Sequence, residues 1–304
     1  MDVRQLSALV AIADHRGFSA AARALHTVQS NISSHVARLE RELGVTLVDR
    51  ASATLTPEGE AVVERARRIQ TELEALVSDV AAVHSEVAGT TRIGVIGTTA
   101  RWLVPPLLEA MAAAYPAVQI VVVDATTTSL LPQVANGRLD LGVIALPAAD
   151  PDVDTEPLFD EDLVVVAPAG HALAARDRVT LPEVAEYDLL LEPKGTAFRD
   201  DLDAQARAAG IVLHTRAELD GMRLVASLAF EGFAPAVLPA SAVVESSAPT
   251  WQRVQIDGVT RRTVGLAWRR RGLPSAATRA IRGVLTNVVA EQVPRHPGLY
   301  LDHA

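Results

Sequence analysis

A set of short polar side chains stands out in the stretch HTVQSNISSHVARLERELG, residues 26–44. Its apolar residues recur at helical spacing, but the other face carries Gln, Ser and Asn where a charged surface would be routine. Such side chains can approach base edges in the major groove of DNA, where glutamine can pair with adenine through two hydrogen bonds. We predict that this face reads DNA through Gln29, Ser30, Asn31, Ser33 and Ser34.

Basic residues near this stretch are suited to the DNA backbone. His35 and Arg38 follow farther along the same helix, and Arg50 stands where it could reach the flanking phosphates. Phosphate contacts position a protein, whereas base contacts specify the sequence. We add Ser19, at the start of the preceding short helix, to the predicted DNA contacts. Taken alone, the polar face is more typical of a solvated helix surface, so its context decides.

That context is a compact helical unit with a hairpin. VRQLSALVAIADHRG predicts an amphipathic helix, and Ser19 can cap a second short helix, AAARALH. The third helix turns Ile32, Val36, Leu39 and Leu43 inward. VTLVDRASATLTPEG then alternates around a polar tip, as a two-stranded wing would. Residues 1–60 are therefore predicted to form an all-α winged helix-turn-helix domain, whose third helix enters the major groove.

A long helix is predicted to follow over residues 61–88. Thr56, Pro57 and Glu58 form a helix start, with an N-cap oxygen, a preset φ and a carboxylate at the positive end of the helix dipole. Apolar residues then recur at steps of four and three, which favours a partner helix from a second chain. The alternative is a helix lying on its own domain. The predicted dimerisation residues are Val62, Ala66, Ile69, Leu73, Leu76, Val80 and Val83, with Val87 continuing the seam.

From residue 89 to 294 the pattern changes to strands alternating with helices. RIGVIG, VQIVVV and LDLGVIAL are buried-strand runs separated by helical stretches. This order predicts α/β structure with largely parallel sheets covered on both faces, and the length fits two sheets. The tail, residues 295–304, has no clear pattern.

The N-terminal region resembles the DNA-binding domain of LysR-type transcriptional regulators. The matching residues are Phe18, Ser19, Ala21, Ala22, Leu25, His26, Gln29, Ser33, Val36, Leu39, Glu40, Leu43, Gly44, Leu47, Arg50, Leu55, Thr56 and Gly59. The resemblance implies a ligand-responsive regulator of double-stranded DNA, a dimer or a tetramer made of two dimers, and RNA polymerase as a further partner. It also implies a C-terminal half similar to periplasmic solute-binding proteins, with two α/β subdomains around an effector cleft.

Polar residues at predicted strand ends and helix starts are the candidate effector site. Such loops bind ligands in open α/β sheets, and helix N-termini attract anions. Together with the only lysine, Lys194, this predicts a small, anionic effector. The alternative is that the threonines merely cap helices. The predicted effector residues are Thr98, Thr99, Thr127, Thr128, Thr196, Phe198 and Arg199.

Composition restricts the remaining classes of protein. The net charge is −9, so any DNA binding must rest on locally placed arginines. The sequence has no cysteine, no export signal and no membrane-length apolar run, from which we expect a cytoplasmic protein. GVIGTT lacks the third glycine of a dinucleotide site and the eight histidines are scattered, so we expect no enzyme, metal or cofactor. A transport protein would not need the first 88 residues. A sensor of the same fold that acts mainly through protein partners is the remaining alternative.

Overall fold

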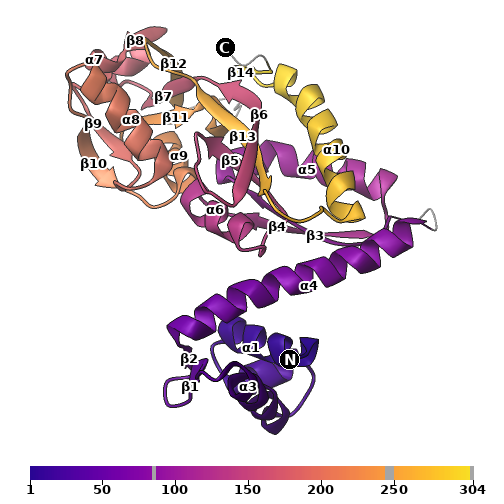
Figure 1. Ribbon diagram of the computed structural model, residues 1–304. Coiled ribbons are helices and arrows are strands. Elements are labelled where there is room, and N and C mark those ends of the chain that lie inside the picture. The colour runs from indigo at the N-terminus through magenta and orange to yellow at the C-terminus, as the bar shows by residue number, and fades with distance from the viewer. Residues whose placement is uncertain (84–86, 244–249, 302–304) are drawn as a thin grey trace.

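The computed structural model describes residues 1–83, 87–243 and 250–301. A small helical domain lies at the N-terminal end of one long helix, and a larger α/β domain lies alongside the rest of that helix (Figure 1). Among the described residues, no helix is long and apolar enough to cross a membrane.

The N-terminal domain consists of three helices and a hairpin. Its elements are α1 (Val3–His15), α2 (Phe18–Ala24), α3 (Gln29–Leu43), β1 (Val48–Asp49) and β2 (Thr54–Leu55). The predicted inward residues Ile32, Val36 and Leu39 are buried against α1 and α2, as expected. Leu43 is 41% exposed, because the helix ends directly after it at Gly44, which adopts a left-handed φ of 74°. β1 and β2 pair antiparallel and form the predicted wing.

Helix α4 (Pro57–Val83) starts where the sequence predicts, since Thr56 Oγ1 accepts a hydrogen bond of 3.0 Å from Gly59 N. Gly59 lies so close to the wing that a Cβ there would be 2.0 Å from the Leu47 carbonyl oxygen. The first turns of α4 complete the N-terminal core. Ala66 is fully buried in that core, so the prediction that it contacts a second chain is wrong. Val62 is only partly buried against the core, and its contact with a second chain stays a prediction. Residues 84–86 lie outside the described residues, and Val87 is not helical.

Two six-stranded sheets form the larger domain. The first has the order β14-β6-β13-β5-β3-β4 and the second β10-β9-β11-β7-β12-β8. The strands of the first sheet are β3 (Gly89–Val95), β4 (Val118–Asp124), β5 (Leu141–Leu146), β6 (Val153–Glu161), β13 (Arg262–Arg269) and β14 (Leu299–Tyr300). Those of the second are β7 (Leu163–Pro168), β8 (Arg178–Thr180), β9 (Asp188–Leu191), β10 (His214–Glu218), β11 (Ala236–Pro239) and β12 (Trp251–Asp257).

The sheets are mixed, so the prediction of largely parallel sheets is wrong. β3 runs parallel to β4 and β5, but β13 is antiparallel to both of its neighbours. The reason is topological: the chain leaves the first sheet after β6, builds the second, and returns as β13 between β5 and β6. The tail contributes β14, which pairs with β6. Each sheet has its own core, and together with its helices we call it the first or second subdomain.

Helices cover both sheets. In the first subdomain they are α5 (Gly97–Ala114), α6 (Thr127–Ala135) and α10 (Ala276–Gln292), with α5 and α10 side by side (Figure 1). In the second they are α7 (Leu181–Val184), α8 (Ala197–Ala208) and α9 (Met222–Phe230). Short 3₁₀ turns are η1 (Ala172–Ala175), η2 (Ala240–Ala242) and η3 (Val293–Arg295). The chain crosses between the subdomains twice, after Glu161 and before Arg262.

Candidate nucleic-acid interface and effector cleft

The outer face of α3 carries most of the side chains predicted to read DNA. Its buried residues lie on the opposite side, which leaves the polar face in solvent. Ser33 is half-buried at the edge of this face. Arg38 has no ion pair among the described residues, so its guanidinium is available to a phosphate. The exposed residues are Gln29, Ser30, Asn31, Ser34 and Arg38.

Two side-chain hydrogen bonds order the start of α3. Ser19 Oγ, at the start of α2, donates to Gln29 Oε1 over 2.8 Å. Asn31 Nδ2 donates to Thr27 Oγ1 over 2.9 Å. The Ser19 bond fixes the direction of the Gln29 amide while leaving its NH₂ group and one oxygen lone pair free. A preorganised donor and acceptor at the tip of α3 is what adenine recognition requires.

His35 and Arg50 differ in how they meet the predictions. His35 is half-buried, its Nδ1 is buried, and the ring lies near Asp2 at the start of α1. The pKa of Asp2 is lowered mainly by the hydrogen bond from Gln5 N, and His35 adds to this. His35 is therefore only partly accessible, and its contact with a phosphate stays a prediction.

Arg50 is exposed on the wing and bonded to Glu40 over 3.2 Å, at the edge of the same surface.

A cavity of about 220 Å³ lies between the two subdomains. The first subdomain contributes the start of α5 and the connection from β4 to α6, and the second contributes the starts of α8 and α9. All four are helix N-termini or the loops that lead into them, as predicted. We call this cavity the cleft. Its polar lining residues are Thr98, Asp124, Thr126, Thr127, Glu192, Thr196, Arg223 and Arg262.

Four of the predicted effector residues line the cleft. They are Thr98, Thr127, Thr196 and Phe198. Thr127 Oγ1 accepts a hydrogen bond of 3.0 Å from Ala145 N, and Thr196 caps α8 by accepting one of 3.4 Å from Arg199 N. These two threonines therefore also have structural roles. Thr98 Oγ1 instead accepts from Arg262 Nη2 over 2.9 Å.

The other three predicted effector residues do not reach the cleft. Thr99 is fully buried one position behind Thr98, and Thr128 is exposed on the outer side of α6. The Arg199 guanidinium turns inward, where it donates to Asp203 over 3.0 Å and to the Glu192 carbonyl over 2.9 Å. Lys194 is exposed and does not line the cleft either.

The charged groups of the cleft were not predicted from the sequence. Arg223 and Asp124 form an ion pair of 2.7 Å between the subdomains. Arg262 forms one of 2.5 Å with Glu161, which is fully buried. Burial raises the pKa of Glu192, and Arg262 counteracts this in part. These residues are dispersed along the chain, and only the two crossings bring them together.

The arrangement suits binding and shows no set of metal ligands in the part of the chain that the structure describes. Two family models match the chain. Residues 3–60 match "Bacterial regulatory helix-turn-helix protein, lysR family", and residues 84–290 match "LysR substrate binding domain". The chain belongs to the LysR family. It is thus a DNA-binding transcriptional regulator and not an enzyme.

Individual members of the LysR family resemble the chain over most of its length. A probable hydrogen peroxide-inducible genes activator of Streptomyces viridosporus is 36% identical over 79% of this chain and 78% of that protein. The dual regulator OxyR of Escherichia coli is 30% identical over 88% of this chain and 90% of its own. The structure of a full-length OxyR from Pseudomonas aeruginosa, with a cysteine replaced by aspartate, covers 100% of this chain and 99% of its own, with 27% identity and a TM-score of 0.77.

Proposed function

We propose that this LysR-family regulator binds a small effector reversibly in the cleft, and that binding changes the relative positions of two DNA-reading helices. One observation carries this proposal. Arg262 joins Thr98, which lines the cleft, to Glu161, which begins the first crossing between the subdomains. A ligand that displaces Thr98 or Arg262 therefore acts on the point about which the subdomains can turn, a rigid-body change of a common kind.

The effector must act without a thiol. The relatives named above include a probable activator of hydrogen peroxide-inducible genes. Protein responses to peroxide commonly use a cysteine thiolate, which is oxidised and later reduced. These 304 residues contain no cysteine. Noncovalent occupancy of the cleft, rather than thiol oxidation, is accordingly the signal in this proposal.

The chemistry of the cleft favours a small carboxylate. A volume of about 220 Å³ lies below the ~300–1,000 Å³ typical of sites for drug-sized ligands. Both lining arginines are already paired, Arg223 with Asp124 and Arg262 with Glu161. The first pair is the more exposed, with Arg223 68% and Asp124 30% accessible, so a carboxylate can take the place of Asp124 there.

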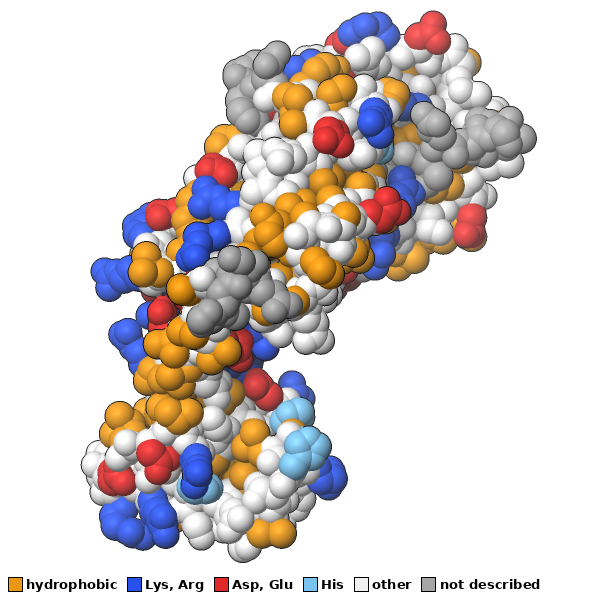
Figure 2. Space-filling model, turned by 90° about the vertical axis from the view of Figure 1, so that its right-hand side faces the viewer, with side chains coloured by type: hydrophobic (Ala, Val, Ile, Leu, Met, Phe, Trp, Pro, Cys, Tyr) orange, Lys and Arg blue, Asp and Glu red, His pale blue; other side chains and the backbone are white. Residues whose placement is uncertain are grey.

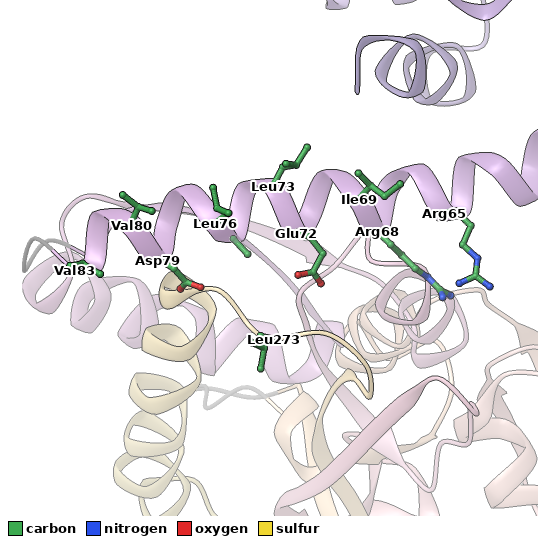
Figure 3. Close-up of a pocket in the computed structure, with 11 residues that line it drawn as sticks. Arg65, Arg68, Ile69, Glu72, Leu73, Leu76, Asp79, Val80, Val83 and Leu273 are labelled. Atoms are coloured by element: carbon green, nitrogen blue, oxygen red, sulfur yellow. The ribbon is translucent and has the colours of Figure 1, made fainter. Parts of the chain in front are cut away.

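Pairing of two chains through α4 completes the proposal. Hydrophobic side chains gather along the narrow waist between the two lobes of the molecule (Figure 2). We call the larger α/β domain, which consists of the two subdomains, the regulatory domain. On α4, Leu73 and Val80 point away from it (Figure 3). An uncovered apolar stripe of this kind fits the same stripe of a second copy. The exposed apolar residues of α4 are Ile69, Leu73, Leu76, Val77, Val80 and Val83.

We extend the proposal to a tetramer of two such dimers, which contacts RNA polymerase at promoters in the cytoplasm, where the chromosome is. The alternative, a sensor that acts mainly through protein partners, is distinguished by its weak affinity for DNA.

Fluorescence anisotropy with the duplex upstream of the protein's own gene, against a scrambled duplex, tests this at low and near-physiological salt. Preference for the upstream duplex, weakening with salt, supports the regulator. Equal, weak binding to both by a folded dimer supports the sensor. The same assay then screens small carboxylates.

A further inference from the structure

A second cavity, of about 210 Å³, lies where α4 meets the regulatory domain. None of its lining residues lines the cleft. Arg65, Arg68 and Glu72 line it from α4, and their side chains point to the side of the helix opposite Ile69 and Leu73 (Figure 3). The regulatory domain supplies the remaining charged groups, which are Asp152, Arg269 and Arg271.

Carboxylates satisfy these arginines incompletely. Four arginines face two carboxylates, which leaves an excess of positive charge in the cavity. The two ion pairs that cross it are long, at 3.4 Å for Arg68 with Asp152 and 3.3 Å for Arg269 with Glu72. Arg68 also pairs with Glu64, which lies outside the cavity.

The other two arginines have no carboxylate at all. Within residues 1–83, 87–243 and 250–301, neither Arg65 nor Arg271 forms an ion pair or a side-chain hydrogen bond. Both are exposed at the rim of the cavity, so each can turn its guanidinium inward at little cost.

Two guanidinium nitrogens are buried without an acceptor. They are Arg68 Nε and Arg269 Nη1, and no described group accepts from either. A buried donor attached to a charged group is costly to leave unpaired. Gly272 borders the cavity, and a Cβ there would be 2.7 Å from Glu72 Oε1 and 3.0 Å from Arg269 Nη2, so a side chain at this position would crowd the charged groups that line the cavity.

We propose that this cavity binds a doubly charged phosphate-class oxyanion, either free or as the phosphate group of a small metabolite. Arginine presents planar, paired donors that match phosphate oxygens, and the dianion balances the excess charge. The bound anion joins α4, which carries the DNA-binding domain, to the regulatory domain. It thereby fixes the direction of α4 independently of the effector cleft.

Isothermal titration calorimetry of the full-length protein with inorganic phosphate, in chloride buffer, tests the proposal. We expect the double variant Arg65→Gln, Arg271→Gln to raise the Kd for phosphate at least ~10-fold, because two charge-assisted interactions are lost. The matched double variant Arg207→Gln, Arg216→Gln, which removes two exposed arginines of the second subdomain, should leave the Kd unchanged. Asp152→Asn should lower the Kd, since the Asp152 side chain competes for Arg68.

A phosphomonoester, glycerol 3-phosphate, separates the two sources of the anion. Tighter binding than that of phosphate indicates a metabolite, and equal or weaker binding indicates the free ion. Two results would overturn the proposal: no saturable phosphate binding by the wild-type protein, or the same Kd in the wild-type protein and the Arg65, Arg271 variant. Circular dichroism and thermal unfolding of every variant, without phosphate, check that each one folds.

Discussion

Arg223 Nη2 and Asp124 Oδ2 lie 2.7 Å apart and join α9 of the second subdomain to the end of β4 in the first. Gly97 lies beneath them, where a Cβ would come within 2.9 Å of Asp124 Oδ1. The pair bridges the two subdomains at one side of the cleft. Any ligand that enters must either accommodate this ion pair or replace one of its members.

The identity of the replaced member can be tested once a binding effector is found. If a carboxylate effector takes the place of Asp124, Asp124→Asn should tighten effector binding and Arg223→Gln should weaken it by ~10-fold, about one charged hydrogen bond. Calorimetric titration measures both. Changes of the same sign in the two variants would contradict an anionic effector.

Thr98→Val tests the link from the cleft to the crossings. The variant removes the hydrogen bond that Arg262 donates over 2.9 Å while keeping the size of the side chain. We expect DNA affinity without effector to be unchanged and the effector-induced change in anisotropy to be lost or strongly reduced. An effector-induced change in anisotropy as large as that of the wild-type protein would show that Thr98 lines the cleft without transmitting the signal.

Gln29→Ala should weaken binding to the specific duplex by about 1–3 kcal/mol, because an oriented amide at the tip of α3 is lost. Binding to scrambled DNA should change little. Arg38→Ala is the contrasting variant. It should weaken binding to both duplexes and reduce the slope of log affinity against log salt by about one unit. Equal losses on both duplexes for Gln29→Ala would withdraw its reading role.

The apolar stripe of α4 predicts a dimer. Leu73→Asp combined with Val80→Asp places two charges on that stripe, where Leu73 is 41% and Val80 is 56% exposed in the single chain. We expect light scattering to report the mass of a monomer. Val212→Asp, at another exposed apolar position, should leave the mass of the dimer unchanged. A dimer that survives the double variant must use another surface.

Glu192 makes stability depend on pH. Burial raises its pKa above the ordinary 4.5, so the folded protein keeps this proton at pH values where the unfolded chain has released it. The contribution to stability is complete below 4.5 and is lost as the pH rises through the pKa of the folded state. Urea unfolding should show the free energy of unfolding of the wild-type protein falling relative to Glu192→Gln over this interval. A constant difference between the two proteins would contradict the raised pKa.

Local patterns in the sequence were sufficient to predict most of the N-terminal domain and the start of α4. The apolar spacing of Ile32, Val36 and Leu39 identified the buried face of α3, and Thr56 with Pro57 fixed the start of α4. Ala66 was misassigned because a continuous seam does not reveal which of its turns the chain's own core already covers.

The cleft could be predicted only in part, since it depends on distant segments. Thr98 and Thr196 stand at helix starts that a local pattern reveals. Arg262 donates to Thr98 although the two residues are 164 positions apart in the sequence. The sequence around Arg262 does not distinguish it from Arg261, which pairs instead with Asp162. Arg199 has the right position at a helix start, but burial among carboxylates turns it inward.

Helix α4 also acts as a lever arm. Its 27 residues span ~40 Å at the rise of an α-helix, with the DNA-binding domain at its N-terminal end and the regulatory domain alongside it from Arg68 onward. A tilt of ~10° about the regulatory end would move the DNA-binding end by ~7 Å, about two base-pair steps along the duplex. Small rearrangements where α4 packs against the regulatory domain are in this way magnified to the scale of a DNA register.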